Sequence, residues 1–205
     1  MAMDIYLIRH GETDWNKTKR LQGVTDIPLN AYGIELAEKT AEGLKDVPFD
    51  RIYTSPLIRA RKTAEIIRGD RPIEIIETDG LKEISFGDYE GLCYLPDNYT
   101  IPKPGFRKFF DDPEHYDTPP HGESLLHLRE RTSSFVRSIM DDPANENMTF
   151  LMTAHGAAIR GILSGLQNLP LAEFWSGPVH KNCGVTKLHV EHGKFNIEFE
   201  NRLYY

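Results

Sequence analysis

The chain has 205 residues, of which 40% are hydrophobic and 27% charged, a composition typical of a globular protein with one α/β domain. The formal net charge of −7 argues against a nucleic-acid partner, because such partners usually require a basic surface. The sequence has two widely spaced cysteines and no apolar run long enough for a secretory leader or a membrane span. We therefore expect no disulfide framework, no cysteine-based metal site, no membrane partner and a cytoplasmic location.

The first predicted element is a buried strand over residues 5–8, which ends at Arg9, His10 and Gly11. The glycine allows the backbone to turn there, so Arg9 and His10 are expected at the carboxyl end of a sheet, where open α/β folds bind ligands. Arginine offers a permanently charged, bidentate donor for an oxyanion, and a neutral imidazole is a nucleophile near physiological pH. The pair predicts phosphate chemistry.

Asn30 is expected to cap a helix that runs to Leu44, and a short strand is predicted over residues 51–54. Ser55 and the proline after it indicate the start of another helix, which places Arg59 about one turn from its N-terminus. Free N–H groups at a helix N-terminus attract anions, and an arginine there would strengthen the attraction.

After a predicted strand over residues 73–76, the segment 93–121 is rich in proline, tyrosine and turn-forming residues. Long irregular segments in compact domains are usually functional. We expect a lid-like insertion that covers the site, with Arg107 or Lys108 meeting a second anionic group of the substrate. A short helix over residues 106–110 that packs on the core is an equally good interpretation.

A long helix is predicted from Ser124 to Ile139, followed by a strand over residues 150–154 that ends at His155 and Gly156. His155 therefore follows a predicted strand and precedes a glycine, as His10 does. If the two strands belong to one parallel sheet, the two imidazoles converge on one site. Two other His-Gly pairs, at 121–122 and 192–193, lie outside strand ends and are expected in turns.

The last two strands, over residues 185–190 and 195–199, are predicted to form an antiparallel hairpin at the sheet edge. The predicted fold is thus a three-layer α/β/α sandwich with a mostly parallel sheet, in one domain over residues 1–205. The histidines that lack metal-ligand spacing are expected on the surface or in loops: His115, His121, His127 and His180.

Six ordered motifs resemble the histidine phosphatase superfamily, the phosphoglycerate mutase-like proteins. The resemblance extends over nearly the whole chain. The motifs are Arg9-His10-Gly11-Glu12-Thr13 with Trp15-Asn16; Leu21-Gln22-Gly23 with Asp26, Pro28-Leu29 and Gly33; Ser55-Pro56-Leu57 with Arg59; Leu81-Lys82-Glu83-Ile84 with Phe86-Gly87 and Glu90-Gly91; Gly122-Glu123-Ser124; and Ala154-His155-Gly156 with Arg160.

The resemblance implies that His10 accepts the phosphoryl group and that Glu83 acts as the acid and then the base. The phosphoryl oxygens would be held by Arg9, Arg59, His155 and Asn16, with Gln22, Gly23 and Gly156 as further substrate-binding positions.

From the residues alone, Asn16 could be a turn residue and Gln22 a structural loop residue. Glu83 also has acidic neighbours, Asp79, Asp88 and Glu90. Glu83 must be protonated to donate, so we expect a raised pKa and an acidic activity optimum.

The predicted activity is hydrolysis of a small phosphorylated metabolite through phospho-His10, without a metal or cofactor. A phosphoglycerate mutase is the alternative, although related cofactor-dependent mutases are longer and carry Arg-His-Tyr-Gly after the acid glutamate. This chain has Ile84-Ser85-Phe86-Gly87 instead, which favours hydrolysis. A non-catalytic phospho-ligand binding module is a third interpretation, and a homodimer is compatible with all three.

Overall fold

The computed structural model describes residues 2–102 and 104–205. Its centre is a six-stranded sheet in the order β3-β2-β4-β1-β5-β6. The first four strands in this order are parallel to one another, and β5 pairs antiparallel with both of its neighbours, β1 and β6. The strands are β1 (Ala2–Arg9), β2 (Arg51–Thr54), β3 (Ile75–Glu77), β4 (Thr149–Ala154), β5 (Val185–Glu191) and β6 (Lys194–Arg202).

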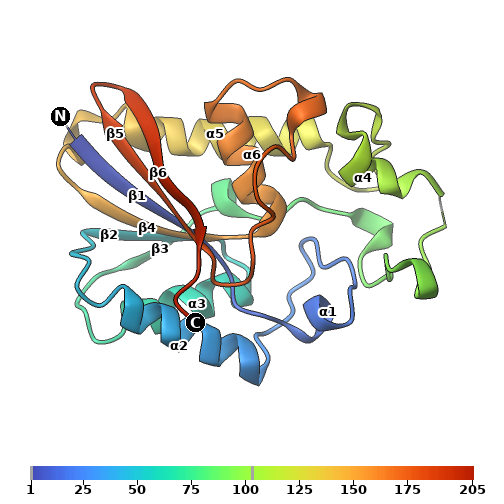
Figure 1. Ribbon diagram of the computed structural model, residues 1–205, viewed down its shortest axis with the longest axis horizontal. Coiled ribbons are helices and arrows are strands. Elements are labelled where there is room, and N and C mark those ends of the chain that lie inside the picture. The colour runs from blue at the N-terminus through green and yellow to red at the C-terminus, as the bar shows by residue number, and fades with distance from the viewer. Residues whose placement is uncertain (1, 103) are drawn as a thin grey trace.

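Helices cover both faces of the sheet, which gives the expected three layers (Figure 1). Helices α2 and α3 lie on one face and α5 and α6 on the other, while α1 and α4 lie beyond the sheet. The helices are α1 (Asp14–Lys17), α2 (Ala31–Gly43), α3 (Ile58–Arg68), α4 (Lys108–Asp111), α5 (Leu125–Met140) and α6 (Gly156–Leu166). Among the described residues, no helix is both long and apolar enough to cross a bilayer.

The hydrophobic pattern of the sequence explains how the layers pack. Along α5, buried residues recur every three or four positions, and the Ser124 side chain caps the helix by accepting from the N–H of His127 at 3.1 Å. Asn30 caps α2 in the same way, through the N–H of Gly33. The apolar strand residues form one core with α5 and α6 and another with α2 and α3. Burial of these faces fixes the sheet relative to both helix layers.

The sheet register brings three strand ends to one edge. Arg9 of β1 pairs with Ala154 of β4, and Thr153 of β4 pairs with Thr54 of β2. The residues that follow these strands, His10, His155 and Ser55, therefore begin from neighbouring positions. The two other His-Gly pairs lie in turns, as predicted, with positive φ at His121 and His192.

Two predicted boundaries were wrong. Helix α3 begins at Ile58 rather than at Ser55, because the carboxylate of Asp26, from a distant loop, accepts the N–H of Ile58 at 2.7 Å. The Ser55 hydroxyl instead accepts the N–H of Leu57 and contacts His155. The third strand lies at Ile75–Glu77, two residues later than its predicted start, where it pairs with β2.

Candidate active site

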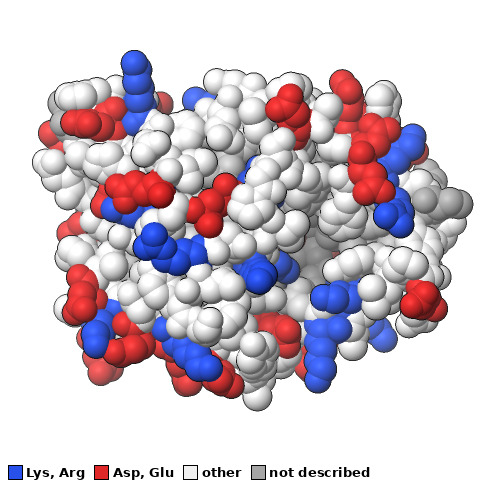
Figure 2. Space-filling view, in the orientation of Figure 1, with Lys and Arg blue, Asp and Glu red and all other residues white. Residues whose placement is uncertain are grey.

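The strand ends open into a cavity with an empty volume of about 790 Å³, part of which is open to solvent. Figure 2 shows the surface hollowed between the part that carries α4 and the rest of the molecule. The cavity has a polar end, formed by Arg9, His10, Asn16, Gln22, Gly23, Arg59, Glu83 and Gly156. The cavity also has an aromatic wall, formed by Phe86, Tyr94, Phe109, Phe110 and Trp175.

His10 follows β1 directly and is almost fully buried. Its Nδ1 lies 2.7 Å from the carbonyl oxygen of Gly11. Because a carbonyl only accepts, Nδ1 carries the proton and the lone pair of Nε2 is free. Burial, with the charges of Arg59 and Arg9, holds the pKa of His10 well below its usual range. The imidazole is therefore neutral at physiological pH.

His155 lies next to His10, with 5.1 Å between the ring centroids. Its Nε2 is 2.8 Å from the Ser55 hydroxyl, and its Nδ1 has no hydrogen-bond partner among the described residues. Burial and Arg59 lower the pKa of His155 well below its usual range. The two imidazoles converge as predicted, but the His155 side chain is fully buried and is not among the described residues that line the cavity.

Arg59 is held in the first turn of α3 with no exposed surface. Its NH1 and NH2 groups donate to the carbonyls of Thr25 and Gly23, at 2.8 and 2.6 Å. Burial lowers the pKa of Arg59 to about 10, so the guanidinium stays charged at neutral pH. Gly23 has a φ of +52°, and a side chain there would collide with Glu90, which explains why this position requires glycine.

Arg9, at the end of β1, lines the same end of the cavity. Its NH1 donates to the carbonyl of His180 at 2.5 Å, and its Nε has no partner among the described residues. The Arg9 guanidinium lies beside Gly156, the first residue of α6, where even a Cβ would be 3.6 Å from it, an ordinary contact distance. This places a positive charge at a helix N-terminus, which favours an anion.

Asn16 and Gln22 both make structural contacts, which was one of the two interpretations for each. Asn16 completes a capping box with Thr13 at the start of α1, and Gln22 accepts from the Thr13 hydroxyl at 2.9 Å. Both side chains also line the cavity. Because their oxygens accept from Thr13, their amide N–H₂ groups are the donors left for a ligand.

Glu83 is the acidic residue of its segment that lines the cavity. Its carboxylate accepts from the N–H groups of Ala157 and Ala158, at 3.2 and 3.0 Å, in the first turn of α6. Burial raises the pKa of Glu83, and the opposing hydrogen bonds and arginine charges offset this only in part. By contrast, Glu90 accepts the backbone N–H groups of Val24 and Thr25 and stabilises their loop.

The aromatic wall comes mainly from the segment that the sequence predicted to be lid-like. Phe109 is buried in a second apolar cluster, where its ring centroid lies 5.0 Å from that of Trp175. Phe110 is 43% exposed and faces the same tryptophan. The segment thus forms a short helix on a core, α4, and also lines the cavity.

Arg107 and Lys108 do not reach the cavity, contrary to the expectation of an electrostatic contact there. Arg107 is on the surface, where it pairs with Asp111 at 2.9 Å. Neither residue is among those that line the cavity in the described part of the chain. The reason is the packing of α4, whose apolar face turns inward and whose basic residues therefore point outward.

His180 lies in a loop, one of the two locations expected for it, but its side chain is buried and not on the surface. It is 2% exposed, lines the cavity and lies 2.8 Å through Nε2 from the Thr186 hydroxyl. Burial lowers its pKa to about 3. Trp175 and Arg160 also line the cavity, and Arg160 is paired with Glu200 at 2.7 Å. No local spacing indicated His180 or Trp175, because both reach the site through an irregular loop.

One group of side chains has metal-ligand character, but it lies away from the cavity. The ligand atoms of Asp4, His189 and Glu198 come within 4.8 Å of one another. The Lys187 ammonium contacts both carboxylates at 2.9 Å and compensates part of their negative charge. This arrangement disfavours a second cation.

Comparison with known proteins places the chain among phosphatases and mutases. Residues 5–202 match the model of the histidine phosphatase superfamily, branch 1. The uncharacterized phosphatase PhoE of Bacillus subtilis is 40% identical over 78% of this chain and 75% of its own length. A probable phosphoglycerate mutase, GpmB of Escherichia fergusonii, is 33% identical over 94% of this chain and 87% of its own.

A solved structure, YhfR of Bacillus stearothermophilus, superposes with a TM-score of 0.90 at 35% identity, covering 98% of both chains. This similarity confirms the α/β fold with its antiparallel edge. The family match extends over nearly the whole chain, and the two relatives are 40% and 33% identical to it over the aligned residues. The chain belongs to the histidine phosphatase superfamily.

Proposed function

We propose that this protein hydrolyses phosphate monoesters through a phosphohistidine at His10, without a metal ion. The observation that carries the proposal is the tautomer of His10. Its Nδ1 donates to the Gly11 carbonyl, which leaves the Nε2 lone pair free at a cavity lined by Arg9 and Arg59. Phosphoryl transfer depends chiefly on positioning and on compensation of charge, and these three residues supply both.

In the first step, Nε2 of His10 attacks phosphorus and the bond from phosphorus to the ester oxygen breaks. The leaving oxygen takes the proton of Glu83, whose raised pKa favours the protonated form. In the second step, Glu83 takes a proton from water, and the resulting hydroxide attacks phosphorus and breaks the P–N bond. Arg9 and Arg59 neutralise the phosphoryl oxygens in both steps, with a further donor from the Asn16 amide.

His155 supports this chemistry from its position next to the His10 ring. Its buried, neutral ring leaves the position of His10 free of added positive charge, and its unpaired Nδ1 is a donor or acceptor available to the phosphoenzyme. Gln22, Gly23 and Gly156 complete the binding surface, Gly23 through its support of Arg59.

We infer that the substrate is a small phosphorylated metabolite whose organic group contacts the aromatic wall. Phe110 and Trp175 offer apolar surface in the cavity, and the segment 93–121 acts as a lid over it. Several classes of phosphate ester fit this description.

The test compares phosphate release by the wild type and by His10→Ala across a panel of phosphate monoesters, in the presence of EDTA. We expect release by the wild type and a loss on the order of 10⁴-fold or more in the variant. Acid-labile ³²P on the wild type, absent from His10→Ala, would identify the intermediate. Wild-type activity that EDTA abolishes, or that survives in His10→Ala, would refute the proposal.

A phosphoglycerate mutase is the second candidate, because GpmB of Escherichia fergusonii bears the name of a probable phosphoglycerate mutase. The residues after Glu83, from Ile84 to Gly87, differ from the Arg-His-Tyr-Gly of the related mutases. The same assay therefore includes 3-phosphoglycerate, with formation of 2-phosphoglycerate measured in parallel. Interconversion without phosphate release would favour the mutase, and phosphate-ester binding without turnover would favour a binding module.

A further inference from the structure

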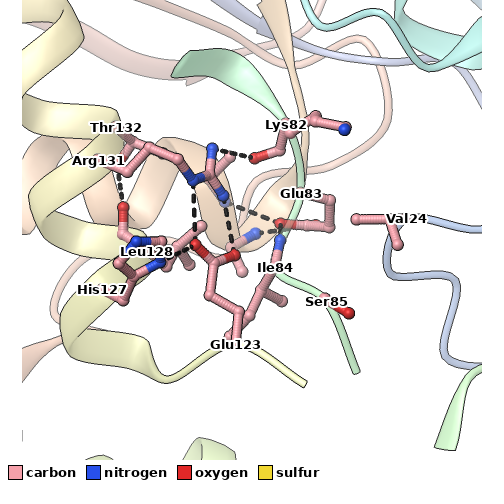
Figure 3. Close-up of polar contacts among 12 residues, drawn as sticks. Val24, Lys82, Glu83, Ile84, Ser85, Glu123, His127, Leu128, Arg131 and Thr132 are labelled. Carbon is pink, nitrogen blue, oxygen red and sulfur yellow. Dashed lines mark hydrogen bonds and ion pairs between the residues drawn. The ribbon is translucent and has the colours of Figure 1, made fainter. Parts of the chain in front are cut away.

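The motif Gly122-Glu123-Ser124 has no place in the chemistry above, yet its glutamate forms a mostly buried ion pair. The Glu123 carboxylate binds the Arg131 guanidinium in a bidentate pair, with Nε–Oε1 at 3.0 Å and NH2–Oε2 at 2.9 Å. The two side chains are only 12% and 20% exposed. Figure 3 shows them pointing toward each other across the first two turns of α5. Such a planar pair fixes the orientation of the arginine.

The remaining nitrogen of Arg131 binds the backbone on the N-terminal side of Glu83. NH1 donates to the carbonyl of Asp79 at 2.7 Å and to that of Lys82 at 3.2 Å. On the C-terminal side, the backbone N–H of Glu123 donates to the carbonyl of Ser85 at 2.8 Å. The segment that carries Glu83 is therefore held on both sides by one ion-paired unit of α5 (Figure 3).

Glu83 lines the reaction cavity, where its carboxylate accepts from α6, and it also lines a surface hollow that Glu123 and Arg131 line. Arg131 contacts the backbone carbonyls of the segment. A general acid must lie within hydrogen-bond reach of the leaving oxygen, and displacement of about 1 Å can reduce the rate on the order of 100-fold. The backbone turn before Glu83 sets that position.

We propose that Arg131, oriented by Glu123, is a positioning residue that holds Glu83 for proton donation to the leaving group. The inference rests on the proposed role of Glu83 as the general acid. Lysine cannot replace the arginine here, because an ammonium lacks the planar set of donors that binds one carboxylate and two carbonyls together.

The experiment measures kcat/KM of Arg131→Lys with p-nitrophenyl phosphate and with glycerol 2-phosphate. The nitrophenolate leaves without protonation, whereas the glycerol alkoxide requires it. We expect glycerol 2-phosphate to lose roughly 10- to 100-fold and p-nitrophenyl phosphate less than about 3-fold. A purely structural defect would reduce both equally.

The matched control is Arg129→Lys on the same helix. Arg129 also donates to a backbone carbonyl, that of Leu169 at 2.9 Å, but far from Glu83 in the fold, so the substrate ratio should not change. Glu83→Gln should change the ratio in the same direction as Arg131→Lys. Combining Glu83→Gln with Arg131→Lys should change it no further, because the arginine acts through the glutamate.

The outcomes separate the two proposals. An unchanged ratio in Glu83→Gln would refute the acid role of Glu83. A changed ratio in Glu83→Gln with an unchanged ratio in a folded Arg131→Lys would overturn the positioning role of Arg131. If thermal unfolding shows that Arg131→Lys is not folded, Glu123→Gln provides the test, since it removes the charge that orients Arg131 and should shift the ratio in the same direction.

Discussion

The polar end and the aromatic wall of the cavity are built in different ways. At the polar end, the two arginines and His10 bind backbone carbonyls. Arg59 binds the carbonyls of Gly23 and Thr25. Arg9 binds the carbonyl of His180, and His10 binds the carbonyl of Gly11. The wall is held by contacts between rings from α4 and two loops, with centroids 5.0 to 6.1 Å apart, and by a bond from the Trp175 indole N–H to the Phe109 carbonyl. Bonds from charged and catalytic-site side chains to the main chain fix the polar end, whereas Phe110 contributes to the wall through ring contacts. We therefore expect substitutions in the wall to change selectivity and to leave the chemistry of the polar end intact.

The strongest test of this separation is Arg59→Lys. An ammonium cannot bind two carbonyls and an oxyanion in one plane, so transition-state charge loses its compensation. We expect kcat/KM to fall on the order of 10² to 10³-fold, uniformly across esters, because every substrate presents the same phosphoryl group. Steady-state kinetics on an aryl and an alkyl ester would show this.

Arg61→Lys is the matched control, since Arg61 lies two residues further along α3, more than half exposed, and pairs with Glu65 and Glu77. Its activity should match that of the wild type. A loss in Arg59→Lys that affects only some esters would contradict the separation.

The pH dependence tests the polar end as a unit. Activity requires neutral His10 and protonated Glu83. Burial lowers the pKa of His10 well below 6.5, so the imidazole stays neutral in mild acid, and burial raises the pKa of Glu83 above 4.5, so the carboxyl keeps its proton to higher pH. With an alkyl ester, kcat/KM should peak on the acidic side of neutrality and fall about tenfold per pH unit above the pKa of Glu83.

In Glu83→Gln, the fall at high pH should disappear from the profile, because the amide does not titrate. A wild-type optimum on the alkaline side of neutrality would contradict the assignment of Glu83 as the acid.

The convergence of the polar end could be predicted because it follows from local patterns. Apolar runs that end in Arg9-His10 and in His155 identify two strand ends, and parallel pairing of β1 with β4 brings them together. The family resemblance, rather than the chemistry, selected Glu83 from its acidic neighbours. The roles of these residues stay predictions until the variants are measured.

The remaining features could not be predicted because they depend on contacts between distant segments. Asp26 caps α3 from a loop more than thirty positions earlier, which local propensity at Ser55 cannot reveal. Trp175 and His180 reach the cavity from the loop before β5, and nothing in their immediate sequence indicates burial. Sequence patterns thus predicted the residues attached to regular elements, and tertiary packing decided the others.

Phe110→Ala tests the aromatic wall. The ring is 43% exposed and lines the cavity, so its removal should spare the fold while removing apolar contact with the substrate. We expect kcat/KM for 1-naphthyl phosphate to fall roughly 10-fold and that for glycerol 2-phosphate to change less than about 2-fold.

Leu126→Ala is the control for Phe110→Ala, because Leu126 is similarly exposed, at 44%, on α5 and away from the cavity. Equal losses on both esters in Phe110→Ala would mean that the wall also positions the polar end, and would contradict the separation.

The smallest effect is expected for the double substitution Arg107→Ala and Lys108→Ala. The Arg107–Asp111 pair is at the surface, with side chains 74% and 59% exposed, and such pairs contribute little to stability. Arg20, by contrast, lines the cavity, where it could contact a second anionic group of a substrate. For substrates with a carboxylate beside the phosphate, KM should therefore change less than about twofold in the double variant. In Arg20→Ala, KM for the same substrates should rise several-fold, because a charge is removed from the site. If KM rose in the double variant and stayed unchanged in Arg20→Ala, the second anionic group would contact Arg107 or Lys108. These basic residues of the α4 region would then have to turn toward the cavity when substrate binds.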